Sequence, residues 1–295
     1  MTVPLLHSRT LAQVDKLSVA INSSYIFHGP RSSGKMTTAM WLAERLACDG
    51  DGGDNCSVCR QIESANYPDL IIVAPEDKPS VTIEQIRRLF TTLALSPYRA
   101  DGTRLVLIDQ AEMLTTEAQN ALLKNLEEPP SRTQFILVTS ALESLLPTVR
   151  SRLATVYFAP VASADIADFL QQRSNVRPVD AAALAELSDG LVGEAVRLSD
   201  LPEAATARTE LDHAASQLLH PNRFTRLIAA RRLADNKQPM TDLLSLLQRR
   251  VVASLVDGQA AAEVRRQIAA LVSARRLLAA GVVSRVVLDR LTVEL

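Results

Sequence analysis

Short apolar runs alternate with helix-like stretches along residues 1–160 of this 295-residue chain. Four runs of mostly apolar residues are each bounded by turn or polar residues, at 24–28, 69–73, 104–109 and 134–140. Between them, apolar residues recur at helical spacing, notably over 36–47, 83–95 and 116–128. Short apolar runs suit parallel strands that helices cover on both faces. The alternation therefore predicts an α/β domain with a parallel sheet.

The helix predicted from residue 116 has clear ends in the sequence. Thr116 with Gln119 matches a capping-box pattern, and Pro129-Pro130 stops the helix. The apolar residues within it lie on one face, which we expect to pack against the sheet.

The pattern changes after Pro160. Three short helices are predicted, at 163–172, 178–187 and 192–198. From residue 203 the pattern is helical throughout, with no convincing strand before a short run near the C-terminus. We therefore predict an α/β domain over 1–160, a small helical domain over 161–203 and a helical C-terminal domain over 204–295.

Composition limits what the chain can do alone. Hydrophobic residues make up 47% and charged residues 22%, and the net charge is −1. These values are ordinary for a soluble globular protein, and the absence of a basic excess does not favour tight autonomous DNA binding. No secretory signal or membrane-spanning run is recognised, and the three cysteines cannot all pair within one chain. We expect a cytoplasmic protein without a membrane partner.

A glycine-rich segment follows the first predicted strand. Residues 29–35, from Gly29 to Gly34-Lys35, match G-x-x-x-x-G-K between a strand and a helix, where a P-loop belongs. Its glycines let backbone N–H groups point at phosphate oxygens, and the helix N-terminus adds a favourable dipole. Lys35 would supply a cation to the phosphates. A chance glycine-rich turn is the alternative, which the strand before and the helix after disfavour.

Two positions of this site lack the usual chemistry. The residue after Lys35 should be Ser or Thr, whose hydroxyl ligates Mg²⁺, but it is Met36. Thr37 lies one residue later, rotated by about 100° around a helix, so it does not simply substitute. Asp109 ends an apolar run, as does the Mg²⁺-binding Asp of P-loop ATPases, but Gln110 follows it and an amide is no general base. Phosphate binding, with ATP or ADP, could survive while hydrolysis suffers.

Longer motifs add a resemblance to a known family. NALLKNLEEPP at 120–130 and LLPTVRSR at 145–152 resemble the bacterial clamp-loader family of the AAA+ superfamily. Within it the chain looks most like delta-prime subunits of DNA polymerase III, which often lose the magnesium and glutamate positions. The resemblance implies an AAA+ P-loop parallel sheet domain, a helical lid and an all-α C-terminal collar that oligomerises. It implies partners in a hetero-pentamer of motor and delta-type subunits, which loads a sliding clamp onto primer-template DNA.

The resemblance also implies roles for individual residues. Ser151-Arg152-Leu153 corresponds to the family's Ser-Arg-Cys motif, whose arginine reaches the ATP site of a neighbouring subunit. Thr139 and Ser140 correspond to the sensor-1 region, without showing which of them is the sensor. The arginine of the sensor-2 region is absent after Gly190, and Arg197 falls too late.

Three cysteines cluster between residues 48 and 59. Cys48, Cys56 and Cys59 resemble the family's four-cysteine zinc module, whose fourth position would fall at Ile62. The C-x-x-C pair is a usual zinc half-site. Three thiolates with Asp49, Asp51, Asp54 or water could hold zinc, and a metal-free loop is the alternative.

Three functions remain open from the sequence. The first is a non-hydrolysing or weakly active clamp-loader subunit that supplies Arg152 to a neighbouring ATPase. The second is an active clamp-loader motor with variant site residues. The third is an AAA+ interaction scaffold outside replication, against which the LEEPP and Ser151-Arg152 motifs count.

Overall fold

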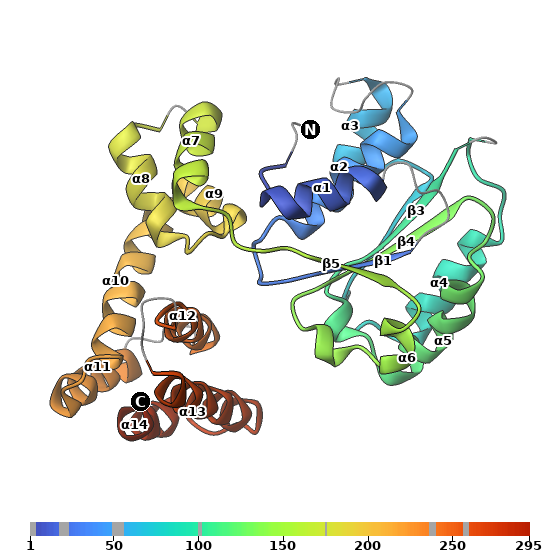
Figure 1. Ribbon diagram of the computed structural model, residues 1–295. Helices are drawn as coiled ribbons and strands as arrows, with labels where there is room; N and C mark the ends of the chain where they lie inside the picture. Colours follow the sequence, from blue (N-terminus) through green and yellow to red (C-terminus); the bar gives the residue numbers. More distant parts are fainter. Residues whose placement is uncertain are drawn as a thin grey trace. The chain divides into compact units, whose positions relative to one another are not determined.

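The computed structural model describes seven segments of the chain, residues 4–17, 24–48, 56–99, 102–174, 176–235, 240–255 and 260–295. The chain divides into two compact units, Met1–Val196 and Arg197–Leu295. Figure 1 follows the chain through both. The predicted boundaries at residues 160 and 203 stay predictions, because the helices after residue 160 are grouped with the sheet up to Val196.

A five-stranded sheet forms the centre of the first unit, with strand order β2-β3-β4-β1-β5. Its strands are β1 Tyr25–His28, β2 Leu70–Val73, β3 Arg104–Ile108, β4 Thr133–Thr139 and β5 Ala154–Tyr157. Every pairing in it is parallel. The predicted parallel α/β sheet is confirmed, and the four predicted strands match β1 to β4 within one residue at either end.

The fifth strand was not predicted. β5 lies at the edge of the sheet, and of its residues only Val156 is buried. An edge strand that is half exposed carries no run of apolar residues, so the criterion used for the other strands misses it.

Helices cover both faces of the sheet (Figure 1). One face carries α1 Ser8–Leu17, α2 Lys35–Ala47 and α3 Ser57–Glu63, and the other carries α4 Ile83–Leu93, α5 Thr116–Glu127 and α6 Pro147–Arg150. Two short 3₁₀ turns, η1 Ala111–Met113 and η2 Leu142–Ser144, complete the connections. Alternate strand residues point to opposite faces: Phe27 packs with the first set of helices and Ile26 with the second.

The start of α5 differs from the prediction. Thr115, not Thr116, is the N-cap, and its hydroxyl accepts a hydrogen bond from the Ala118 amide. Gln119 is buried and its amide instead bridges two loops: it donates to the Leu114 carbonyl and accepts from the Leu146 amide. Two adjacent threonines made the capping residue ambiguous by one position.

After the sheet come three helices close to the predicted positions, α7 Ser163–Ser174, α8 Pro178–Leu187 and α9 Val192–Asp200. The second unit contains α10 Pro202–Leu218, α11 Arg223–Asp235, α12 Met240–Ala253, α13 Ala261–Ala279 and α14 Ser284–Glu294. Its described residues pack around a leucine-rich core. The predicted short strand near the C-terminus is wrong: Val287, Leu288 and Leu291 recur at helical spacing and are buried on one face of α14.

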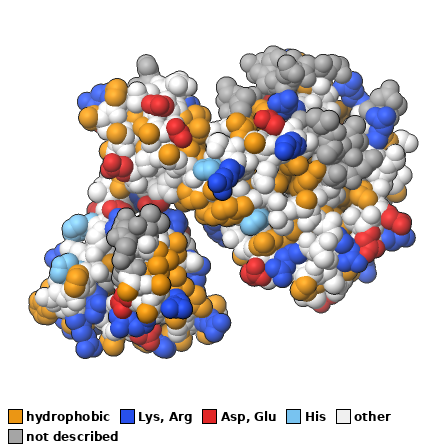
Figure 2. All heavy atoms as spheres, viewed as in Figure 1, with side chains coloured by type: hydrophobic (Ala, Val, Ile, Leu, Met, Phe, Trp, Pro, Cys, Tyr) orange, Lys and Arg blue, Asp and Glu red, His pale blue; other side chains and the backbone are white. Residues whose placement is uncertain are grey.

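Surface charge is mixed. On the face drawn in Figure 2, basic and acidic side chains are interspersed over the described residues of both units, as expected from the net charge of −1. Among the described residues, no helix is both long enough and apolar enough to cross a bilayer.

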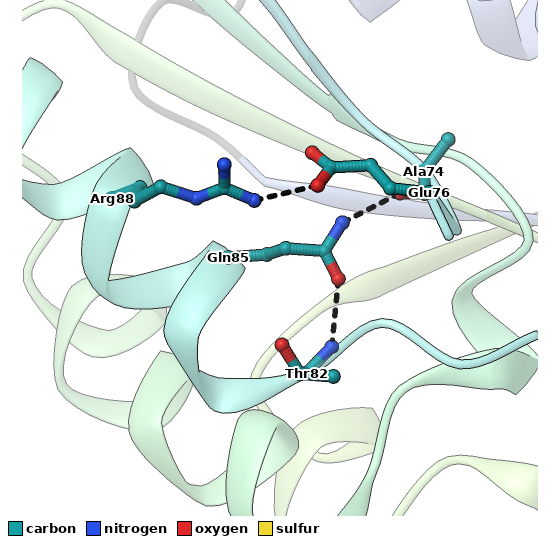
Figure 3. Close-up of polar contacts among 5 residues, drawn as sticks. All are labelled: Ala74, Glu76, Thr82, Gln85 and Arg88. Carbon is teal, nitrogen blue, oxygen red and sulfur yellow. Dashed lines mark hydrogen bonds and ion pairs between the residues drawn. The ribbon is translucent and has the colours of Figure 1, made fainter. Parts of the chain in front are cut away.

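The loop after β2 is fastened to the start of α4 by one amide side chain. Gln85 accepts a hydrogen bond from the Thr82 amide at 2.9 Å and donates to the Ala74 carbonyl at 2.8 Å (Figure 3). Beside it, Arg88 forms an exposed ion pair with Glu76. Gln85 is buried, so both of its bonds are sheltered from water, whereas the ion pair is solvated.

Replacing Gln85 with Ala should therefore destabilise the protein by about 1–3 kcal/mol, because a cap is lost and a carbonyl loses its partner. Chemical denaturation monitored by circular dichroism measures this loss. Arg88→Ala is the matched control and should remain close to the wild type. Equal effects of the two substitutions would contradict the assignment.

Candidate nucleotide site

The phosphate loop lies at the carboxyl edge of the sheet, between β1 and α2. Gly29 has φ +145°, and a Cβ there would lie 2.6 Å from the Phe158 carbonyl oxygen. Gly34 has φ +86° and precedes the first residue of α2. Both positions require glycine, the first for close approach to the chain after β5 and the second for its left-handed conformation. The loop therefore has the backbone course that its motif predicts.

Lys35 is folded back into this loop. Its ammonium donates to the carbonyls of Gly29 at 2.9 Å and Pro30 at 2.6 Å, and to the Ser33 hydroxyl. Burial lowers the pKa of Lys35 to about 8, against the opposing influence of the carboxylates of Glu112 and Asp109. The cation thus sits among loop carbonyls, with two acidic side chains near enough to act on its charge.

Of the positions that would handle magnesium and water, only residue 109 carries a carboxylate. Met36 is half-buried and packs against the core of the α1–α3 face. Thr37 is exposed. Asp109 follows β3, and its carboxylate accepts a hydrogen bond from the Gln110 amide at 2.9 Å. Gln110 is exposed with φ +49°. Residue 36 thus provides no hydroxyl ligand and residue 110 no carboxylate, and Asp109 is the acidic residue that these positions retain.

Glu112 is a site residue whose place the sequence did not reveal. Its carboxylate accepts hydrogen bonds from the hydroxyls of Thr139 at 2.8 Å and Ser140 at 2.6 Å, and from the Ser140 amide at 3.2 Å. Burial raises the pKa of Glu112, but hydrogen bonds from Ser140, its own amide and Thr139 outweigh burial and lower it. Thr139 and Ser140 therefore share one acidic partner. The turn at Gln110, which starts η1, gives the chain the course that brings Glu112 there.

A helix after the sheet touches the tip of the phosphate loop. The Gly193 amide, in the first turn of α9, donates to the Ser32 carbonyl at 2.8 Å. A Cβ on Gly193 would lie 3.0 Å from that same oxygen. The helical region and the loop are thus in backbone contact within the first unit.

Arg152 lies at the amino-terminal ends of the strands, opposite the carboxyl ends where the phosphate loop lies. It precedes β5, whose first residue Ala154 pairs with Tyr25, the first residue of β1, whereas the phosphate loop follows the last residue of β1. The strand alone separates the two edges by about 10 Å. The Arg152 side chain is 32% exposed, and Ser151 beside it is exposed. The structure thus separates these two residues from the chain's own phosphate loop.

The three cysteines converge beside α3. The sulfur atoms of Cys48, Cys56 and Cys59 all lie within 4.8 Å of one another, and those of Cys48 and Cys56 are 3.5 Å apart. The sulfur of Cys56 accepts a hydrogen bond from the Cys59 amide. This bond is the largest of the influences that lower the pKa of the Cys56 thiol. Ile62 is fully buried in the core, so it offers no fourth ligand. Asp49, Asp51 and Asp54 lie outside the described residues.

The parallel strand order β2-β3-β4-β1-β5, with a P-loop after β1, is that of the AAA+ type of fold. A family model described as "DNA polymerase III, delta subunit" matches residues 10–162. A DNA polymerase III subunit delta' of Bacillus subtilis is 36% identical over 197 residues, 65% of this chain and 58% of the relative. That of Yersinia pestis is 32% identical over 232 residues, 75% of this chain and 68% of the relative. The chain belongs to the delta-prime clamp-loader family of DNA polymerase III.

Relatives named as gamma and tau subunits of DNA polymerase III also match, over a shorter region. A subunit gamma/tau of Mycobacterium tuberculosis is 39% identical over 136 residues, 45% of this chain and 23% of the relative. A solved structure of a gamma subunit-related protein from Thermotoga maritima has a TM-score of 0.50 at 18% identity and covers 96% of this chain and 97% of its own. That likeness shows the shared fold.

The Glu112 cluster predicts a pH-dependent stability. A carboxyl whose pKa is lower in the folded than in the unfolded protein stabilises the fold above its unfolded pKa of about 4.3, and the effect is lost as the pH falls through the folded value. Glu112→Gln should therefore lower the free energy of unfolding at pH 7 by about 1–2 kcal/mol relative to the wild type. This difference should shrink below about pH 4.3.

Denaturant unfolding at several pH values measures this difference. Glu128→Gln, at an exposed position after α5, is the control and should remain close to the wild type at pH 7. A difference for Glu112→Gln that is the same at pH 7 and pH 3 would contradict the account.

Proposed function

We propose that this chain is a non-hydrolysing or weakly active clamp-loader subunit that supplies Arg152 to the ATP site of a neighbouring subunit. One observation carries the proposal: Arg152 lies exposed at the sheet edge opposite its own phosphate loop. From that edge it cannot serve its own site, so a phosphate that it contacts belongs to another chain. A guanidinium suits this task, because it is permanently charged and forks onto phosphate oxygens.

The chain's own site supports phosphate binding better than hydrolysis. The loop glycines give the backbone course of a phosphate loop, and Lys35 within it would supply the cation, so ATP or ADP is the ligand that the loop suits. Magnesium would need a hydroxyl at residue 36, where a thioether packs into the core instead. The attacking water would need a base at residue 110, where an exposed amide stands. These two losses argue for retained binding with little turnover.

The alternative is an active motor subunit. The match to subunit gamma/tau of Mycobacterium tuberculosis favours it, and the chemistry at Met36 and Gln110 counts against it. A scaffold outside replication is disfavoured by membership of the DNA polymerase III family.

The family implies an assembly around this chain. We propose that it joins motor and delta-type subunits in a hetero-pentamer, which opens a sliding clamp and meets primer-template DNA. In that assembly the chain serves as a structural subunit and donates an arginine to its neighbour.

We further propose that the cysteines hold zinc. Tetrahedral zinc with Zn–S bonds of about 2.3 Å places its sulfur ligands about 3.8 Å apart, and the three sulfurs here already lie within 4.8 Å of one another. A bound zinc would tie the end of α2 to the start of α3, with a fourth ligand from outside these three residues.

Purified protein should therefore contain about one zinc ion per chain, and Cys56→Ser should lose most of it. Serine preserves the cap of α3 that the Cys56 sulfur provides, and Ser57→Ala is the control that should retain the metal. Elemental analysis measures the content. A zinc-free wild type purified without chelators would contradict the proposal.

The finger role predicts that Arg152→Ala slows ATP hydrolysis at the adjoining motor site by about 100-fold or more, since such arginines are worth 10³–10⁵ in kcat. Steady-state hydrolysis by the reconstituted complex, with DNA and clamp present, measures the loss. Arg87→Ala, at an exposed position on α4, should leave the rate unchanged. An unaltered rate with Arg152→Ala would overturn the assignment.

A further inference from the structure

The guanidinium of Arg152 is held on two sides by its own chain. Its Nε donates to the Glu127 carboxylate, and its Nη2 forms an ion pair with the same carboxylate oxygen. Its Nη1 donates to the Thr148 carbonyl at 2.7 Å. Glu127 is the last residue of α5 and Thr148 lies in α6, so two helices fix one side chain.

These contacts leave part of the guanidinium available. An arginine has five N–H donors, and three are engaged here, one on each nitrogen. One N–H remains on Nη1 and one on Nη2. Two N–H groups on neighbouring nitrogens make the fork that binds two oxygens of a phosphate. Glu127 therefore occupies the side of the guanidinium and leaves the donors that a neighbour's nucleotide would need.

The surroundings keep this arrangement in place and open to solvent. Leu153, the next residue, is buried in the core of the α4–α6 face and anchors the backbone beside Arg152. Pro129 and Pro130 follow the end of α5 and prevent the helix from continuing beyond Glu127. A surface pocket adjoins the pair, lined by Ser24, Tyr25, Leu126, Glu127, Pro129, Arg152 and Ala154.

We propose that Glu127 is a positioning residue for the arginine that this chain donates. An unheld arginine samples many rotamers and loses that freedom when it binds. Glu127 fixes the side chain in advance, so more of the phosphate contact is realised in the transition state of the neighbouring site. This inference rests on the proposed finger role of Arg152.

Two other roles for Glu127 make different predictions. A carboxylate that competes with the phosphate for Arg152 would slow the neighbour, and its removal would raise the rate. A carboxylate that only stabilises the fold would change the unfolding temperature without changing the rate of the folded complex.

The test compares Glu127→Ala, Glu127→Gln and Arg152→Ala in the reconstituted complex, with Glu128→Gln as the neighbouring control. We expect Glu127→Ala to lower kcat for ATP hydrolysis at the adjoining site by about 10-fold, with KM changed less, since misplacing a catalytic group by an ångström costs up to about 100-fold. Glu127→Gln keeps one acceptor for the guanidinium and should recover part of the rate. Glu128→Gln should match the wild type.

The outcomes distinguish the positioning role of Glu127 from the finger role of Arg152 on which it rests. A loss with Arg152→Ala but none with Glu127→Ala would overturn the positioning role and leave the finger role standing. A higher rate with Glu127→Ala would overturn it in favour of competition. No loss with Arg152→Ala would overturn both. Should Glu127→Ala not fold, Glu127→Gln decides alone: a rate equal to the wild type overturns the positioning role, and a lower kcat supports it.

Discussion

Parallel pairing of β1 with β4 on one side and β5 on the other decides which residues of this chain can meet. Because every strand runs the same way, the segments after the strands gather at one edge of the sheet and the segments before them at the other. The phosphate loop, Asp109 and Thr139 share the first edge, and Arg152 stands at the second. The chain therefore presents its phosphate loop and Arg152, the cation that we propose it donates, at opposite ends of the strands.

At the phosphate edge, groups that would bind a nucleotide already have partners within the chain. Lys35 donates to loop carbonyls, and Thr139 donates to Glu112. Gly193 fastens the loop tip to α9. Buried polar groups cost free energy unless they are paired, and this internal pairing satisfies them without a ligand. The site can thus keep its shape without a bound nucleotide, which supports the non-hydrolysing or weakly active role that we propose.

Much of this could be predicted from the sequence, and the failures have physical reasons. Strands β1 to β4 carried apolar runs because helices cover both faces of the sheet, and the P-loop motif gave the position of Lys35. β5 was not predicted because only Val156 of its four residues is buried, so it carries no apolar run. The hydrogen bonds of Glu112 were not predicted because they depend on the turn at Gln110 and on Thr139, which is distant in sequence. The Glu127–Arg152 pair joins residues 25 positions apart, and spacing alone contains no signal for such a contact.

The central claim is that the phosphate site has kept its shape and lost its chemistry. The most direct measurement is the steady-state rate of ATP hydrolysis by the isolated chain with saturating Mg²⁺, compared with a Lys35→Ala variant. The account predicts that the wild type turns over slowly at most, far below the rate of a motor subunit, because neither residue 36 nor residue 110 can serve magnesium or water. Turnover at the rate of a motor subunit, abolished by Lys35→Ala, would contradict it and identify the chain as a motor subunit.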